Sequence, residues 1–360
     1  MDSYPAYKVA AAHVAPVFLD TPATVEKTCS IIDEAAGHGA QFVAFPEAYI
    51  PAFPNWCALR SPIHNHDLFC RLAAASLRVT GSEIHRICKK ARDCGVFVSL
   101  GFNERSEVSA GCLWNANVLI GDDGSILNHH RKLVPTFYEK LVWAPGDGAG
   151  LRVCDTRLGG IGMLICGENT NPLARYTLMA QGELVHVASF AGIWPSHPAD
   201  EPDTYDLPRA IRLRAAAHAF EEKGFNIVVS SFMDKPMRDE LAGLAPDAGC
   251  ILDSSSRAIS IVIGPNGEPV SGEMQNEEGI LYADIDLAAC VEPKQMHDVI
   301  GGYNRFDIFR LEVDRSAHRP IHFPFEEADE PEEPLILHED DGSLDDAVTG
   351  KEKRQTQHRR

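Results

Sequence analysis

Apolar and polar positions alternate along the chain with two different periods. Mainly apolar runs at 8–15 and 41–45 have the length and the composition of buried strands. Between them, apolar residues recur every three or four positions from Val25 onward, which is the period of a helix that buries one face. Thr21 and Pro22 come just before and are predicted to cap this helix and form its first turn. The pattern therefore predicts an α/β fold.

The same alternation continues through the rest of the chain. Helices are predicted in 67–93, from Pro172 to about Gln181, and from Pro208 to about Lys223. Further strands are predicted at 96–102, 151–154, 161–165, 183–188 and 226–231. Residues 114–128 have the pattern of a hairpin, and the runs 258–263 and 280–285 are predicted to form an antiparallel pair. No internal repeat interrupts this order.

Composition and charge limit the kinds of partner. The 360 residues are 44% apolar and 24% charged, as in an ordinary globular protein. Because 52 Asp and Glu oppose 33 Lys and Arg, the net charge of −19 repels a phosphate backbone, and no nucleic-acid partner is expected. We predict one domain over residues 1–324, followed by a charged tail, residues 325–360, that is either disordered or in contact with a neighbouring subunit.

The cysteines and the N-terminal residues bear on the cellular compartment. The ten cysteines include no Cys-x-x-Cys pair, and the apolar run near the N-terminus is interrupted by His13 and Pro16. We therefore predict reduced thiols, no signal peptide, no membrane partner and a cytoplasmic location.

Three residues at the ends of apolar runs carry the candidate chemistry, namely Glu47, Lys132 and Cys166. A cysteine thiol with a pKa of ~8.5 is mostly protonated at neutral pH, so a nucleophilic cysteine needs a base or a positive neighbour. Glu47 is the candidate base, and Lys132 is the candidate group that neutralises charge developing on the substrate. Taken singly, each residue has an ordinary alternative role. Glu47 would be a solvated carboxylate, Lys132 a surface lysine and Cys166 a buried structural thiol.

The sequence around these residues favours a common role. The three segments are Ala-Phe-Pro-Glu-Ala at 44–48, His-Arg-Lys-Leu-Val-Pro-Thr at 130–136 and Leu-Ile-Cys-Gly-Glu-Asn at 164–169. With these segments in this order, and with further matches at 143–148, 171–181 and 301–309, the chain resembles the nitrilase branch of the carbon–nitrogen hydrolase superfamily. The resemblance covers about residues 7–315. The chain departs from it at Gly167, where nitrilases commonly have Trp, and at Gly302, where they commonly have His.

The resemblance implies a four-layer α-β-β-α sandwich with a catalytic Glu47, Lys132 and Cys166. It also implies a fourth residue, Glu139, that orients substrate or water; the alternative is a surface ion pair between Glu139 and Lys140. No metal ion and no organic cofactor is implied. Nitrilases typically assemble from dimers into spirals, so a homo-oligomer is expected.

The implied reaction converts an organic nitrile and water into a carboxylic acid and ammonia, through a thioimidate and then a thioester on Cys166. The alternative is an amidase or carbamoylase of the same superfamily that uses the same residues on an amide carbon. A non-catalytic assembly protein with this fold is disfavoured, because such a protein would be expected to lose the Glu, the Lys or the Cys.

Several residues beside these segments are candidates for the substrate pocket. They are Phe53, Trp56, His129, Gly167, Phe190, Ile193 and Trp194. For His129 the alternative is a structural hydrogen bond, and for Phe53 and Trp56 it is ordinary core or a subunit contact. Glu168 is expected to bind the backbone around Cys166 rather than to act as a catalyst.

Overall fold

Two six-stranded β-sheets form the centre of the molecule in the computed structural model, which describes residues 4–198, 200–201, 205–319 and 321. The first sheet has the order β12 (Gly279–Asp286), β1 (Ala6–His13), β2 (Ala40–Ala44), β3 (Phe97–Arg105), β4 (Leu113–Ile120) and β5 (Ile126–Arg131). The second has the order β11 (Pro269–Met274), β10 (Ser260–Ile263), β9 (Phe225–Ser230), β8 (Val185–Phe190), β7 (Gly159–Ile165) and β6 (Cys154–Thr156).

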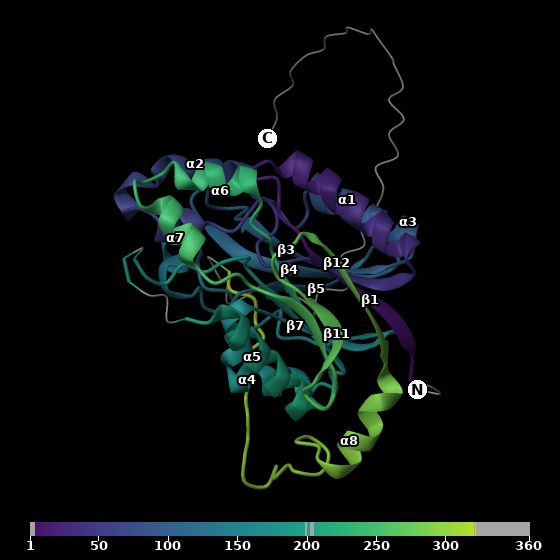
Figure 1. Cartoon of the computed structure of the whole chain (residues 1–360). Helices are drawn as coiled ribbons and strands as arrows, with labels where there is room; N and C mark the ends of the chain where they lie inside the picture. Colours follow the sequence, from purple (N-terminus) through teal and green to yellow (C-terminus); the bar gives the residue numbers. More distant parts are fainter. Residues whose placement is uncertain (1–3, 199, 202–204, 320, 322–360) are drawn as a thin grey trace, which may run out of the picture.

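Helices cover the outer face of each sheet. Figure 1 shows α1 (Thr21–Gly37) and α3 (Ser82–Cys94) on the first sheet, and α4 (Pro172–Met179) and α5 (Leu207–Glu222) on the opposite side of the molecule, against the second. The other α-helices among the described residues are α2 (His66–Ala75), α6 (Lys235–Ala242), α7 (Ala248–Ser254) and the short α8 (Val291–Met296). The predicted α-β-β-α sandwich is confirmed.

Both faces of the central strands are buried, which explains their continuous apolar sequences. In β1, Val9 and Ala11 pack between the two sheets, whereas Ala10 and Ala12 pack against the helices outside. Strands β1, β2 and β3 are parallel, as are β7, β8 and β9. Their carboxyl ends therefore lie together at one edge of each sheet, where α/β proteins commonly carry their ligand sites.

The prediction that 258–263 pairs with 280–285 is wrong. Strand β10 instead forms a hairpin with β11 around Gly267, which has a φ of +80°, and β12 crosses to the first sheet and pairs with β1. Strand β11 is largely exposed and has no apolar period, so the sequence pattern did not reveal it. The stretch between the two predicted strands therefore contains β11 and is not a simple connecting turn.

Two boundaries also differ from the sequence prediction. The strand expected at 151–154 begins only at Cys154, which is opposite Ile161 of β7. The cap of α1 is Asp20 rather than Thr21, since the Asp20 carboxylate accepts a hydrogen bond from the backbone N–H of Ala23 at 3.0 Å. The predicted hairpin at 114–128 is confirmed as β4 and β5, which extend to Arg131.

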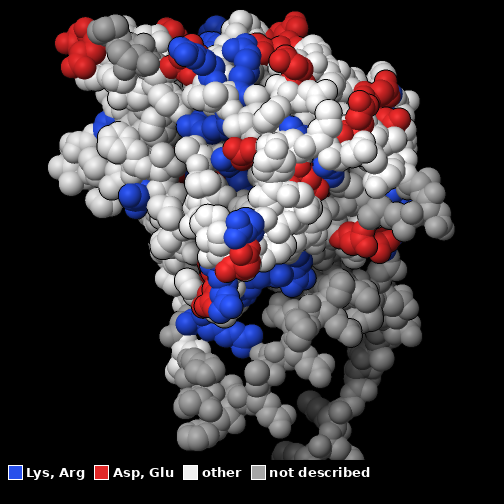
Figure 2. Space-filling model, turned by 90° about the horizontal axis from the view of Figure 1, so that it is seen from below, with Lys and Arg blue, Asp and Glu red and all other residues white. Residues whose placement is uncertain are grey.

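Some sequence predictions concern residues that the structure does not describe. The tail at 325–360, including its proposed disorder or subunit contact, lies outside the described residues. Within the described part of the chain, no helix is both long and apolar enough to cross a lipid bilayer. On the face seen in Figure 2, described Lys and Arg side chains lie interspersed with Asp and Glu, so that face presents mixed charge.

Candidate active site

Glu47 lies in the segment that follows β2, pressed against strand β3. A Cβ atom at Gly101 of β3 would lie 2.1 Å from the carbonyl oxygen of Pro46 and 2.9 Å from the backbone nitrogen of Ala48. Only a glycine at position 101 lets this segment approach so closely. The segment is held there by a hydrogen bond from the N–H of Ile50 to the carbonyl of Gly101.

The Glu47 carboxylate is fully buried and accepts hydrogen bonds at both oxygens. Oε1 accepts from Nδ2 of Asn115 at 2.8 Å and from Nζ of Lys132 at 2.7 Å. Oε2 accepts from the backbone N–H of Ala191, just beyond β8, at 3.0 Å. Since Asn115 belongs to the first sheet and Ala191 follows a strand of the second, this carboxylate links the two sheets at the site.

Lys132 comes directly after β5, and its ammonium group lies between two carboxylates. Besides Glu47, Nζ donates to Oε2 of Glu139 at 2.6 Å. Burial alone would lower the pKa of Lys132, but the charges of Glu47, Cys166 and Glu139 raise it above its ordinary value. The lysine is therefore a fixed cation, although only 1% of its side chain is exposed.

Glu139 is brought to Lys132 by the 3₁₀ turn Phe137–Leu141. Thr136 caps this turn, and its backbone N–H donates to Oε2 of Glu139 at 2.7 Å. The second oxygen, Oε1, is buried with no hydrogen-bond partner among the described residues. The surface ion pair with Lys140, the alternative considered for Glu139, is excluded because Glu139 is buried and paired with Lys132.

Cys166 begins the turn after β7 and has a φ of +52°, in the left-handed region that non-glycine residues rarely adopt. Its Sγ and one carboxylate oxygen each from Glu47 and Glu139 lie within 4.8 Å of one another. Burial and the two carboxylates raise the pKa of the Cys166 thiol well above its usual value, against the opposing effect of Lys132. The resting thiol is therefore protonated, beside a carboxylate that can accept its proton.

These three residues are also the kind that binds metal ions, as cysteine and carboxylate ligands do. The position that a cation would take is already occupied by the Lys132 ammonium, which contacts both carboxylates. The donor set therefore fits an ammonium group better than it fits a metal ion.

Glu168 supports the segments that carry Lys132 and Cys166. Its Oε2 accepts from the backbone N–H of Ile165 at 2.8 Å and pairs with Nε2 of His130 at 2.9 Å, while Oε1 accepts from the N–H of Leu133. The expected contact of Glu168 with the backbone around Cys166 is confirmed.

The predicted pocket residues do not all lie beside Glu47, Lys132, Glu139 and Cys166. His129 lies on the opposite face of β5 from His130, because strand side chains alternate, and it pairs with Glu104 at 2.9 Å. This is the structural hydrogen bond considered as its alternative. Phe190 packs outward beneath α5 in the apolar cluster that Cys166 also contacts.

The other predicted pocket residues surround the segment that carries Glu139. Phe53 and Trp56 are buried in one apolar cluster together with Ile193 and Tyr138. Trp194 stacks on Tyr138 with ring centroids 5.3 Å apart. A Cβ atom at Gly167 would lie 3.0 Å from Oγ1 of Thr136, so position 167 faces the cap of the same turn.

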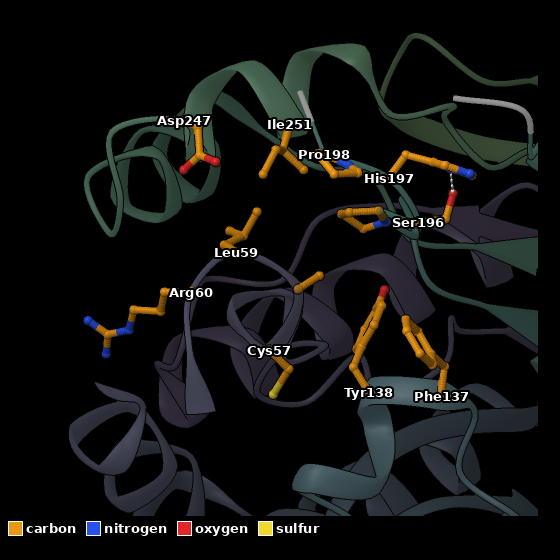
Figure 3. Close-up of a pocket in the computed structure, with 12 residues that line it drawn as sticks. Cys57, Leu59, Arg60, Phe137, Tyr138, Ser196, His197, Pro198, Asp247 and Ile251 are labelled. Carbon is orange, nitrogen blue, oxygen red and sulfur yellow. Dashed lines mark hydrogen bonds between the residues drawn. The ribbon is translucent and has the colours of Figure 1, made fainter. Parts of the chain in front are cut away.

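A cavity of about 420 Å³ opens beside the stacked pair of Tyr138 and Trp194. Figure 3 shows Phe137 and Tyr138 on one wall. Across from them lie Pro198 and, on α7, Ile251. None of the predicted pocket residues lines it, but Cys57 and Pro195, the neighbours of Trp56 and Trp194, do. The predicted residues are therefore chain neighbours of side chains that line the cavity, but they do not line it themselves.

Asn115, Gly101 and the N–H of Ala191 were not found from the sequence, although each fixes Glu47. One signal was available for Asn115, since an amide within the apolar strand β4 must find partners when it is buried. No local signal marks Ala191, because its contribution is a backbone N–H. Such contacts depend on how the two sheets pack.

Gly101→Ala is expected to destabilise the fold by ~1–3 kcal/mol and to lower kcat, because the new methyl group pushes the backbone that carries Glu47. Thermal unfolding and steady-state kinetics measure the two effects. Gly111→Ala is the matched control, since a Cβ there meets nothing within 4 Å. If Gly101→Ala and Gly111→Ala had the same stability and the same kcat, a side chain at position 101 would not disturb the segment that carries Glu47.

Comparison with known proteins gives the same family. The carbon–nitrogen hydrolase family model matches residues 8–295. The chain is 32% identical to Nitrilase 3 from an unknown prokaryotic organism over 318 residues, which are 88% of this chain and 92% of that protein. It is 35% identical over 319 residues to an arylacetonitrilase of Hypocrea virens, with 87% and 93% covered.

A solved structure agrees in fold. The carbon–nitrogen hydrolase of Helicobacter pylori G27 superposes with a TM-score of 0.67 at 20% identity, covering 84% of this chain and 97% of that one. The family-model match, the curated relatives and the shared sandwich lead to one conclusion: this chain belongs to the carbon–nitrogen hydrolase superfamily, in its nitrilase branch.

Proposed function

We propose that this enzyme hydrolyses an organic nitrile to the carboxylic acid and ammonia, with Cys166 as nucleophile, Glu47 as general base, Lys132 as the stabilising cation and Glu139 as the orienting carboxylate. The observation that carries the proposal is the Lys132 ammonium held between two buried carboxylates, with the Cys166 thiol beside them. Curated relatives named nitrilases support the choice of substrate.

In the first half of the reaction, Glu47 accepts the thiol proton as the sulfur attacks the nitrile carbon. The C–S bond forms, one C–N π bond breaks, and the nitrogen takes the proton from Glu47 to give a thioimidate, which leaves Glu47 as a carboxylate again. Hydrogen bonds to Glu47 and Glu139 fix the Lys132 ammonium beside the nucleophile. Its positive charge offsets the negative charge that develops on the nitrile nitrogen.

In the second half, water adds to the thioimidate carbon to form a tetrahedral adduct. The C–N bond breaks and ammonia leaves, so a thioester remains on Cys166. A second water, deprotonated by Glu47, then breaks the C–S bond and releases the acid and the thiol. The unpartnered Oε1 of Glu139 is available to bind one of these waters or the departing nitrogen.

The cavity beside Phe137 and Tyr138 is proposed to receive the substituent of the nitrile, because Tyr138 directly precedes Glu139. Its aromatic wall suits a flat apolar group. The similarity to an arylacetonitrilase also supports an aryl-aliphatic substrate.

A substrate panel with ammonia release as the readout tests the function. We expect turnover of phenylacetonitrile to exceed that of acetonitrile, and the Cys166→Ala variant to release no ammonia from either. Turnover of phenylacetamide without turnover of any nitrile would instead establish the amidase alternative.

Gly167→Trp is expected to lower the amide-to-acid product ratio and to reduce turnover of bulky nitriles. The tetrahedral adduct can lose either ammonia, giving acid, or the thiolate, giving amide. Because glycine has no side chain beside the nucleophile, the adduct has more freedom to move away from Glu47 and Glu139. Chromatography of both products from one small and one bulky nitrile measures the effect.

Gly167→Ala is the control for this substitution, because it adds only the Cβ that approaches Thr136. A ratio and a substrate preference that stay the same in Gly167→Trp would mean that position 167 does not shape the pocket.

Assembly into a homo-oligomer, built from dimers and extended as a spiral, is part of the proposal. Tyr303, Phe306 and Phe309 are exposed in the single chain, and burial in a subunit contact would remove this apolar surface from water. Sedimentation velocity tests this, and a monomer at all concentrations would contradict it.

A further inference from the structure

A second buried group of ionisable side chains lies behind Cys166 and takes no part in the proposed reaction. It contains Glu183 just before β8, His186 within β8, and His218 and Glu222 on α5, all of them buried. Space for the Glu183 carboxyl group exists because residue 162 of β7 is glycine; a Cβ there would lie 2.0 Å from Oε1 of Glu183. The group is therefore built into the packing of the second sheet.

A chain of hydrogen bonds joins this group to the nucleophile. Oε1 of Glu183 lies 2.7 Å from Nδ1 of His186, and Nε2 of the same ring lies 2.8 Å from Oδ1 of Asn169. Nδ2 of Asn169 in turn donates to the carbonyl of Cys166 at 3.0 Å and to that of Leu164 at 3.2 Å. Asn169 thus holds the backbone on both sides of the turn from β7 into Cys166.

The orientation of Asn169 determines where the protons lie. Two carbonyl oxygens face one end of its amide, so that end must be the NH₂ group, and the oxygen must face His186. Nε2 of His186 therefore carries a hydrogen and donates it. If His186 is neutral, its Nδ1 has only a lone pair, and a lone pair facing a carboxylate oxygen at 2.7 Å needs a proton between them.

Burial indicates which partner holds this proton. Burial raises the pKa of Glu183, and burial together with the charge of Arg175 lowers the pKa of His186 to about 3. A neutral acid beside a neutral imidazole satisfies every contact in the chain, since the other oxygen of Glu183 can accept from Nε2 of His218 at 3.0 Å.

We propose that Glu183 is a neutral carboxylic acid in the working enzyme. By donating a hydrogen bond to His186, it holds Asn169 in its hydrogen bond to the carbonyl of Cys166. Glu183, His186 and Asn169 are then positioning residues for the nucleophile. The left-handed backbone at Cys166 needs such support, because a residue with a side chain does not hold this conformation unaided. The functional part of this inference rests on the proposed role of Cys166.

Infrared spectroscopy tests whether Glu183 is protonated, and it needs no substrate. The difference spectrum between the parent and Glu183→Gln should show the loss of a protonated-carboxyl C=O band at neutral pH. Glu222→Gln is the control, because Glu222 is a second buried carboxyl group nearby. Absence of any band specific to Glu183 would overturn the proposal, as would a stoichiometric metal ion bound by Glu183, His186 and His218.

Kinetics test the positioning. Glu183→Gln keeps an N–H donor toward His186 and should retain kcat within about threefold, whereas Glu183→Met and Asn169→Asp should lower kcat by ~10–100-fold with little change in KM. Alkylation of Cys166 by iodoacetamide should slow in the same two variants, and this readout does not depend on nitrile turnover. Equal losses in Glu183→Gln and Glu183→Met would overturn the proposal, even if all variants fold.

The parent should lose kcat at alkaline pH as Glu183 gives up its proton, and Glu183→Gln should not share this loss. The ionisable groups that face the Glu183–His186 pair are His218 and Glu222 of α5, Glu168 of the turn after β7, Arg175 of α4 and Lys294 of α8. An alkaline limb that is identical in the parent and in Glu183→Gln would assign that loss to another group and contradict the proposal.

Discussion

Cys166→Ala is expected to lower nitrile turnover by at least about 10⁴-fold while leaving the fold intact, because the variant has no group that can form the covalent intermediate. The thiol packs against the apolar cluster beneath α5, so alanine fits in its place without a new polar group. Ammonia release measures the activity, and circular dichroism with thermal unfolding checks the fold.

Cys29→Ala and Cys88→Ala are the matched controls for this experiment. Both thiols are buried in the contact of α1 and α3 with the first sheet, and neither belongs to the group that Cys166 forms with Glu47 and Glu139. Their loss should reduce stability and leave kcat per folded molecule unchanged. Substantial activity in Cys166→Ala would rule out the proposed mechanism.

Lys132→Met is expected to abolish activity and to destabilise the protein by ~3–5 kcal/mol, because it leaves two buried carboxylates without their shared cation. The loss of activity follows from the missing charge at the substrate nitrogen. Chemical denaturation gives the stability, and Lys140→Met, on the exposed side of the same turn, is the control.

The stability loss in Lys132→Met should grow as pH rises. Burial already raises the pKa of Glu139, and removing Lys132 takes away the charge that opposes this rise. A carboxyl group whose folded-state pKa is raised stabilises the fold only while it keeps its proton, so the variant should come closest to the parent in acid. A loss that is independent of pH would show that the two charges are not coupled.

The relation between sequence and structure is clearest at β1 and β12, the first and last strands that the structure describes. The apolar run at 8–15 was identifiable as β1, because a strand buried on both faces has a continuous apolar sequence. Its partner β12 was identified as a strand but was predicted to pair with the run at 258–263. Pairing depends on the long-range packing of the two sheets, and the local pattern contains no information about it.

The candidate site shows the same division. Glu47, Lys132 and Cys166 were identified from their places after apolar runs and from the segments around them, and the structure brings all three together. Their supports, among them Gly101 and Asn169, act through backbone approach and through hydrogen bonds that have no signature in the sequence.

The sequence by itself determined most of the strands and helices, the family resemblance and the three candidate catalytic side chains, because each is expressed in residues close together along the chain. Only the tertiary structure decided that Lys132 is shared by Glu47 and Glu139, that His129 faces away from them, and that Glu183 is linked to Cys166. These relations join side chains from different strands and helices. They arise when the two sheets pack and exclude water, which forces each buried polar group to find a partner.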